Sequence, residues 1–340
     1  MAPPRAPLAL TMGEPGGIGG EITVAAWNAL RAEGPAFFPI ADPQRLAHLG
    51  APTKTIEHPS EAPAVFADAL PVLPIGAPVI SIPGRADPRY ADLVLESIRR
   101  AVAFALEGAA SGVVTNPIQK SSLIDAGFEF PGHTEFLDEL TKDAPTPAGL
   151  HRGCVMMIAG PLVRTVPATV HLPLKDAITA LDTDMLIETG RVVASSLAVN
   201  FGVNAPRLAF AGLNPHAGED GKLGREDRDI IAPAVRALEK AGIDAAGPLP
   251  ADGMFHEEAR AAFDAAICMY HDQALIPAKA LNFHEAVNVT LGLPIVRTSP
   301  DHGTALAIAG KGRARADSLI AALRLAAAMA DRRAANVSAA

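Results

Sequence analysis

Three histidines of this 340-residue chain share one kind of position. Each follows the carboxyl end of a short apolar run that is typical of a buried strand, and the three are His171, His216 and His271. In open α/β sheets, ligands collect at the carboxyl ends of the strands, because parallel strands bring those ends together. A single histidine at such a place is more often a hydrogen-bonded structural residue, but three of them favour a shared ligand.

The three imidazoles are suited to binding a metal ion. Neutral imidazoles bind divalent transition metals, and three of them without a cysteine leave a coordination position open, as in catalytic sites. The histidines are 45 and 55 residues apart, unlike zinc-finger ligands, so the tertiary or quaternary fold must bring them together. The sequence therefore predicts one divalent ion, zinc, magnesium or cobalt, bound by His171, His216 and His271.

Several polar residues occur near these histidines in the sequence. Lys279, Asn288 and Arg297 supply two cations and an amide, which in an acidic protein favour an anionic substrate. Asp252 is inserted between apolar residues of the loop 247–255. We interpret it as a general acid or base or as support for a histidine, with a solvated turn residue as the alternative.

Two glycine-containing segments are candidate anion sites. Residues 13–20 follow the first predicted strand and precede a predicted helix, whose free N–H groups suit an anion. Their spacing is not that of a dinucleotide fingerprint, so a merely tight connection is the alternative. Gly132, His133 and Thr134 open another predicted helix and suit a phosphate, although Thr134 as a simple helix cap explains the pattern equally well.

Strand and helix patterns alternate along the chain, which is typical of an α/β fold. The clearest helical patterns cover 87–108, 182–201 and 225–241, and each precedes or follows a predicted strand. A length of 340 residues suits two lobes or one large α/β domain.

Composition narrows the class of protein. Acidic residues outnumber basic ones, 37 to 29, for a net charge of −8, which argues against nucleic-acid or anionic-membrane surfaces. Cys154 and Cys268 both lie beside apolar residues and are expected to be buried reduced thiols. The N-terminus lacks an apolar stretch long enough for a signal peptide, so we expect a soluble cytoplasmic protein.

Eight motifs follow one another in order: MGEPGGIG, TNPIQK, GHTEF, VHLPL, GLNPHAGE, GPLPAD, YHDQALIPAK and TSPDHGTALAIAG. In this order they resemble the signatures of the 4-hydroxythreonine-4-phosphate dehydrogenases, NAD-dependent enzymes of vitamin B6 biosynthesis. The resemblance runs from about Thr11 to the C-terminal helix. It therefore covers nearly the whole chain.

The resemblance implies the two-domain α/β/α fold of isocitrate and isopropylmalate dehydrogenases. It implies a first, discontinuous domain of residues 1–135 plus 295–340 on the cofactor side. The second domain, 136–294, would carry the metal histidines and the dimer contacts. An obligate homodimer is expected, with its active site in a cleft between the domains and shared by both subunits.

The resemblance also assigns roles to individual residues. His171, His216 and His271 fall on the family's metal ligands, and the resemblance implies that one of them, His271, comes from the partner subunit. The positions that match substrate-binding residues are His133, Thr134, Lys279, Asn288 and Arg297. The expected contacts of the cofactor, NAD or NADP, are Gly17, Gly19, His302, Gly303 and Thr304.

The implied reaction is an oxidation followed by loss of carbon dioxide. 4-Phosphooxy-L-threonine would give 3-amino-2-oxopropyl phosphate, carbon dioxide and NADH, in the route to pyridoxal phosphate, with Asp252 or Lys279 as the candidate for proton transfer. The alternative is a related dehydrogenase of threonate or erythronate 4-phosphate. A phosphate acyltransferase and a non-catalytic metabolite-binding protein are more remote alternatives.

Overall fold

The computed structural model describes residues 5–130 and 132–339, which divide into two units. The first unit comprises residues 1–145 and 294–334, and the second comprises residues 146–293 and 335–340. Both units are built from strands and helices in alternation, which confirms the predicted α/β class. The predicted domain limits and the roles given to each domain stay predictions. Within the described ranges, no helix is both long and apolar enough to cross a membrane.

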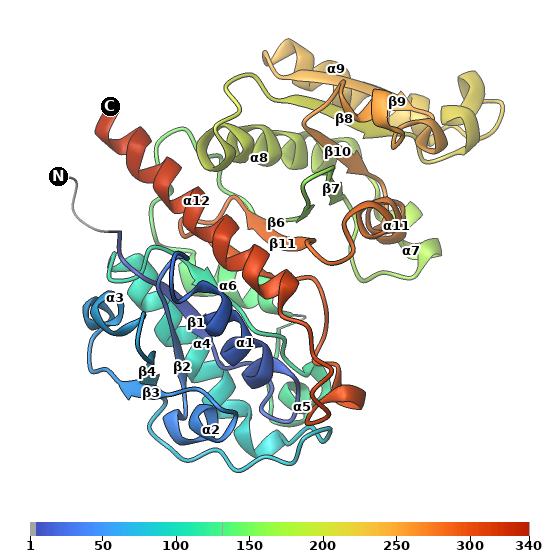
Figure 1. Ribbon diagram of the computed structural model, residues 1–340. Coiled ribbons are helices and arrows are strands. Elements are labelled where there is room, and N and C mark those ends of the chain that lie inside the picture. Colours follow the sequence, from blue (N-terminus) through green and yellow to red (C-terminus); the bar gives the residue numbers. More distant parts are fainter. Residues whose placement is uncertain (1–4, 131, 340) are drawn as a thin grey trace. The chain divides into compact units, whose positions relative to one another are not determined.

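The sheet of the first unit is parallel throughout and has the strand order β3-β4-β2-β1-β5-β12 (Figure 1). Its central strands consist almost wholly of buried apolar residues, as expected for parallel strands covered on both faces. The strands are β1 (Leu8–Thr11), β2 (Phe37–Ala41), β3 (Thr53–Thr55), β4 (Leu70–Pro74), β5 (Val113–Val114) and β12 (Arg297–Pro300).

Helices of the first unit connect and cover these strands. The helix α4 packs on β1, β2 and β5, and Thr298 of β12 donates a hydrogen bond to Ala322 O of α12 at 2.9 Å. The α-helices are α1 (Gly19–Leu30), α2 (Pro43–His48), α3 (Ala62–Val65), α4 (Ala91–Leu106), α5 (Lys120–Asp125), α6 (His133–Thr141) and α12 (Asp317–Ala339). The 3-10 helices are η1 (Pro59–Glu61), η2 (Pro88–Tyr90) and η6 (Leu306–Ile308).

The sheet of the second unit is mixed and has the order β11-β6-β7-β10-β8-β9. The strand β6 is antiparallel to both of its neighbours, whereas β7, β10, β8 and β9 run parallel. The bounds are β6 (Val155–Ala159), β7 (Arg164–Pro167), β8 (Arg207–Ala211), β9 (Asp244–Leu249), β10 (Ala265–Cys268) and β11 (Val287–Leu291). The parallel half is the part of this sheet whose carboxyl ends meet at one edge.

Helices of the second unit follow from local signals in the sequence. Asp182 caps α8 by accepting a hydrogen bond from Met185 N at 2.9 Å, and Gly202 ends that helix in the left-handed conformation. The α-helices are α7 (Leu174–Ala180), α8 (Thr183–Phe201), α9 (Ala232–Lys240), α10 (Glu257–Arg260) and α11 (His271–Asn282). The shorter helices are η3 (Pro215–Gly221), the π-helical η4 (Asp227–Ile231) and η5 (Ala251–Gly253).

The helix predicted over 225–241 differs from the structure. It starts as the π-helical turn η4 and becomes α-helical only from Ala232. Pro233, near the start of α9, has no backbone N–H and cannot continue an α-helical ladder from the preceding turn. The amphipathic pattern alone does not report this local change.

Candidate active site

The three predicted metal histidines lie in the second unit, each just beyond a parallel strand. The strand β10 lies between β7 and β8, so Ile267 pairs with Val166 on one side and with Phe210 on the other. These are the strands that His271, His171 and His216 respectively follow. Three neighbouring strand ends therefore present the three histidines at one edge of this sheet. Their use as metal ligands stays a prediction.

His171 and His271 lie side by side. Their ring centroids are 6.0 Å apart, and both residues line a cavity of about 240 Å³. The other residues of its wall are Leu172, Leu174, Ala177, Tyr270 and Asp272. His271 Nδ1 is 2.7 Å from Asp272 Oδ1, a contact that fixes the ring and leaves Nε2 for a ligand. The sequence reasoning missed Asp272, although a carboxylate directly after a candidate ligand is a usable signal.

His171 and His216 both have an uncommon backbone conformation. Their φ angles are 53° and 52°, in the left-handed region that non-glycine residues rarely adopt. His216 begins a left-handed stretch that continues through Asp220. Each non-glycine residue in that conformation costs about 1–2 kcal/mol, so the surrounding structure must hold it there. Such an arrangement is typical of functional sites.

The described residues contain no group of three or more His, Cys, Asp or Glu side chains placed to hold one ion. The donor set nevertheless fits a divalent ion in part, since His171 and His271 form a pair with a carboxylate behind one ring. His216 is exposed beyond the next strand. A complete metal site would thus need a further ligand beside this pair.

His133 and Arg297 form the core of a second candidate site, within the first unit. His133 opens α6, and its Nε2 atom is buried without a hydrogen-bond partner among the described residues. Burial, with the nearby charge of Arg297, lowers the pKa of His133 to about 3. Arg297 is itself buried and donates to Thr115 Oγ1 at 2.7 Å. A neutral imidazole with an unsatisfied nitrogen near a buried guanidinium suits an anion such as a phosphate.

The two predicted cofactor segments meet in the first unit. Ile18 N donates a hydrogen bond to Thr304 O at 3.0 Å, and Thr304 Oγ1 donates to Gln119 Oε1 at 2.9 Å. The Nε2 atom of His302 is buried and has no partner in the described part of the chain. Gly303 is exposed, and a Cβ atom added there would meet nothing within 4 Å. Open backbone beside an unsatisfied buried nitrogen fits a nucleotide cofactor.

The glycines of the N-terminal turn are explained by packing. A Cβ atom on Gly17 would lie 2.8 Å from Thr304 O, and one on Gly19 would lie 3.3 Å from Met12 O. The close approach that these glycines allow is therefore an approach between protein segments. This observation favours the tight-connection interpretation of the turn and leaves its contact with a cofactor as a prediction.

Three further predicted residues lie in the second unit. Asp252 is exposed in η5, which contacts η3, the segment that contains His216. Lys279 is half-buried in α11, the helix that begins with His271. Asn288 is half-buried in β11 and pairs with Ile158 of β6.

Glu14 is a candidate that the sequence reasoning did not single out. It is buried in the turn after β1, where its carboxylate accepts a hydrogen bond from Gly16 N at 3.0 Å. Burial raises the pKa of this carboxyl, and the charge of Arg45 partly opposes that rise. A perturbed carboxyl in a predicted cofactor turn is a functional signal that only the structure reveals.

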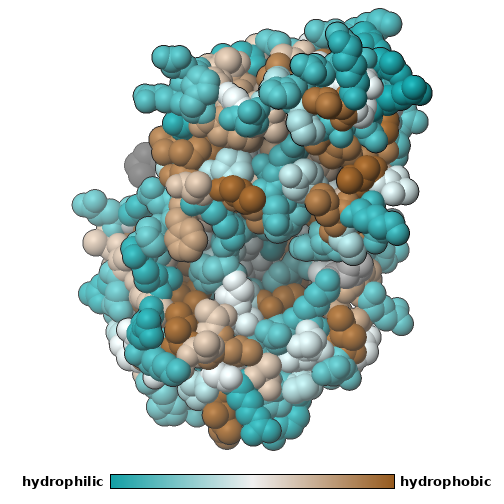
Figure 2. Space-filling model, turned by 90° about the vertical axis from the view of Figure 1, so that its right-hand side faces the viewer, coloured by the Kyte–Doolittle hydropathy of each residue, from teal (hydrophilic) through white to brown (hydrophobic). Residues whose placement is uncertain are grey.

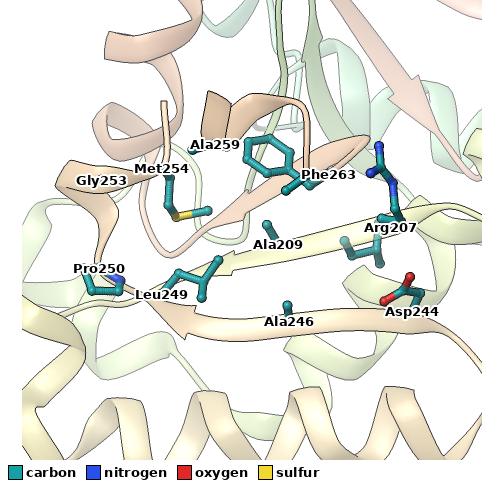
Figure 3. A pocket seen from close by; sticks show the side chains of 12 residues that line it. Arg207, Ala209, Asp244, Ala246, Leu249, Pro250, Gly253, Met254, Ala259 and Phe263 are labelled. Atoms are coloured by element: carbon teal, nitrogen blue, oxygen red, sulfur yellow. The ribbon is translucent and has the colours of Figure 1, made fainter. Parts of the chain in front are cut away.

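A larger apolar cavity of about 320 Å³ lies along β8 and β9 (Figure 3). It is lined by Leu249, Met254 and Phe263, and Arg207 and Asp244 lie at one end of it. None of the predicted site residues lines it. This cavity lies along the strands, whereas His171, His216 and His271 lie beyond the carboxyl ends of their strands. It is therefore a separate site.

Comparison with known proteins identifies the family. The family model of the pyridoxal phosphate biosynthetic protein PdxA matches residues 38–326. The chain belongs to the PdxA family. A 4-hydroxythreonine-4-phosphate dehydrogenase of Caulobacter vibrioides is 55% identical over 331 residues, which cover 96% of this chain and 98% of that protein. The same enzyme of Xanthobacter autotrophicus is 51% identical, with 96% and 94% covered.

The solved structures agree with this membership of the PdxA family. A crystal structure of 4-hydroxythreonine-4-phosphate dehydrogenase from Klebsiella pneumoniae superposes with a TM-score of 0.84 at 35% identity. The match covers 97% of this chain and 99% of that one. The predicted resemblance is thus confirmed over nearly the full length.

Proposed function

We propose that this chain is a 4-hydroxythreonine-4-phosphate dehydrogenase. It oxidises 4-phosphooxy-L-threonine with NAD and releases carbon dioxide, so that 3-amino-2-oxopropyl phosphate and NADH are formed for pyridoxal phosphate biosynthesis. The observation that carries the proposal is the full-length similarity to dehydrogenases of that name at 51–55% identity. The threonate or erythronate phosphate alternative has no observation in its favour.

His171, His216 and His271 would hold the divalent ion. Supporting observations are the three neighbouring strand ends and the 6.0 Å separation of two rings. A bound divalent ion would supply Lewis-acid stabilisation of negative charge on the substrate oxygen during oxidation and decarboxylation. Asp272 contacts Nδ1 of His271, which would leave Nε2 as the donor atom for the ion.

His133, Thr134 and Arg297 would bind the substrate phosphate. Arg297 brings a buried positive charge, and His133 brings a neutral ring with an unsatisfied Nε2 atom. Binding the phosphate at a distance from the reacting carbon orients that carbon without taking part in the chemistry. Asn288 and Lys279 would bind other polar groups of the substrate. Lys279 Nζ or the Asp252 carboxylate would move the proton that replaces carbon dioxide.

The loop at His302, Gly303 and Thr304 would bind the nicotinamide cofactor, together with the turn at Gly17 and Gly19. Support comes from the hydrogen bond that joins the two segments and from the open backbone at Gly303. NAD supplies the hydride acceptor when it is bound. These residues would position it.

A homodimer completes the proposal. Figure 2 looks onto the side of the molecule that carries α7 and α11, and apolar side chains are exposed there. Ile276 and Phe283 are 68% and 70% exposed, and Leu172, Leu174 and Ile178 are exposed in and near α7. Exposed apolar groups of this kind favour a protein interface. In such a dimer, one of the three histidines of each metal site would come from the partner subunit.

The assay is NADH formation, followed with carbon dioxide release, for purified protein with a divalent metal. We expect turnover of 4-phosphooxy-L-threonine and at most weak turnover of erythronate 4-phosphate under the same conditions. Equal or better turnover of erythronate 4-phosphate would contradict the proposed substrate.

A further inference from the structure

The turn that presents His216 is held by the buried carboxylate of Asp227, and Glu226 Oε2 also accepts a hydrogen bond from Asn214 Nδ2 at 2.9 Å. Asp227, the first residue of η4, is 1% exposed. Its Oδ1 atom accepts a hydrogen bond from Leu213 N at 2.7 Å, and its Oδ2 atom accepts one from Asn214 N at 3.2 Å. Oδ2 also accepts a bond from Asn214 Nδ2 at 2.8 Å. Among the described residues, the donors to the Asp227 carboxylate thus belong to Leu213 and Asn214, the two residues that precede the Pro215-His216 pair.

Asn214 is the first residue of the turn that contains His216. Its carbonyl oxygen accepts a hydrogen bond from Ala217 N at 3.0 Å, which closes the turn across Pro215 and His216. Proline at the second position and a left-handed third residue are the pattern of a type II turn. Glycine or asparagine normally takes that third position, so a histidine there is unfavourable. Asp227 holds the first residue of this turn through both its backbone and its side chain.

Three glycines leave room for this arrangement. A Cβ atom on Gly212 would lie 2.9 Å from Asp227 Oδ1, and one on Gly218 would lie 3.0 Å from Asp227 Oδ2. A Cβ atom on Gly224 would lie 2.4 Å from Asn214 Nδ2. The chain therefore closes around the Asp227 and Asn214 pair, and any side chain at these positions would push the pair apart.

We propose that Asp227 is the positioning residue that holds His216 in the conformation in which it binds the metal. The inference rests on the proposed function, which makes His216 a metal ligand. Asp227 does not touch the metal or the substrate; it acts through Asn214 and the turn. Residues that orient a ligand in this way typically change metal affinity 10- to 100-fold when they are replaced.

The matched control is Asp264, which plays the same structural part at the other end of β8. Its Oδ2 atom accepts a hydrogen bond from Arg207 N at 2.9 Å, and its carboxylate pairs with the Arg207 guanidinium. Asp264→Asn removes a comparable set of contacts far along the strand from His216. A merely structural role for Asp227 predicts that both variants lose stability and neither loses metal affinity.

The experiment measures zinc binding by calorimetric titration of the full-length protein, with urea unfolding of each variant as the measure of stability. Asp227→Asn should weaken zinc binding about 10- to 100-fold. Asp264→Asn should change it less than about threefold while still lowering stability. Gly218→Ala, which adds a Cβ atom against Asp227 Oδ2, should weaken zinc binding in the same direction as Asp227→Asn.

The outcomes separate the two proposals. If His216→Ala weakens zinc binding at least about 100-fold but Asp227→Asn binds zinc as tightly as Asp264→Asn, the role of Asp227 is overturned and the metal site stands. If wild-type protein binds no zinc, or His216→Ala binds it normally, both the metal site and this inference fail. If Asp227→Asn does not fold, wild-type affinity in Gly218→Ala overturns the inference.

Discussion

His133 and His216 are prepared for ligands in opposite ways. His133, in the first unit, is held by its surroundings, since burial and a nearby guanidinium leave its ring neutral with an unsatisfied nitrogen. His216, in the second unit, is exposed and is held by its backbone, in a turn that few histidines adopt. We therefore expect the stability of the protein to depend on pH through His133. We expect metal affinity to depend on changes in the turn that holds His216.

The largest effect is expected at His216. His216→Ala should lower divalent-metal affinity by at least about 100-fold, because losing a ligand costs more than losing the 10- to 100-fold contribution of a residue behind one. NADH formation should fall in parallel. Stability should change by no more than about 0.5 kcal/mol, because the ring is exposed. His284→Ala, at an exposed histidine of the same unit, is the control and should bind metal normally.

The next largest effect is expected at Arg297, beside His133 in the first unit. Arg297→Lys keeps the charge but loses the planar fork, so KM for the phosphorylated substrate should rise about 10- to 100-fold with a smaller change in kcat. Steady-state kinetics measures both. The control is Arg333→Lys, which replaces a half-buried arginine of the same unit and should leave KM unchanged. A KM of Arg297→Lys equal to that of wild type would remove Arg297 from phosphate binding.

His133 should make stability depend on pH. Its folded pKa of about 3 lies below the unfolded value of about 6.5, so the unfolded state gains the proton first as pH falls. Wild-type stability should be level above pH 6.5 and fall by about 1–2 kcal/mol between pH 6.5 and 5. His133→Gln should lack this component in urea unfolding, whereas His48→Gln, at an exposed histidine, should keep it. Parallel pH curves for wild type and His133→Gln would contradict the burial of this ring.

The smallest effect concerns the glycines of the two cofactor segments. Gly303→Ala adds a Cβ atom to open space, so stability should change by less than about 0.5 kcal/mol while KM for NAD rises a few-fold. Gly17→Ala adds one 2.8 Å from Thr304 O and should cost about 1–3 kcal/mol in stability. An unchanged KM for NAD in Gly303→Ala would place the cofactor elsewhere.

The ends of the strands could be predicted from the sequence, but the order of the strands in the sheet could not. An apolar run that stops at a polar residue is a local signal, and it located the strands before His171, His216 and His271. The place of β10 between β7 and β8 depends on pairing between residues 57 and 101 positions apart, which no local pattern contains. The sequence therefore predicted that each histidine follows a strand, but it did not predict which histidines lie next to each other.

The supporting residues were harder to predict than the candidate ligands. Asp227 looks like an ordinary acidic residue in a helical pattern, and its meaning appears only when the chain folds back on Asn214. Glu14 and Asp272 likewise acquire a role from burial or from a neighbouring ring. Gly13, Gly16 and Gly17 lie in the predicted turn, whereas Gly19 and Gly20 already belong to α1, and packing against Thr304 explains Gly17.

The most direct test of the account counts the imidazoles around the bound ion. X-ray absorption at the zinc edge of the loaded protein should show three imidazole nitrogens at about 2.0–2.1 Å, and two in the His216→Ala variant at saturating zinc. A spectrum with fewer than two imidazoles, or one that His216→Ala leaves unchanged, would contradict the claim that these three histidines share one ion.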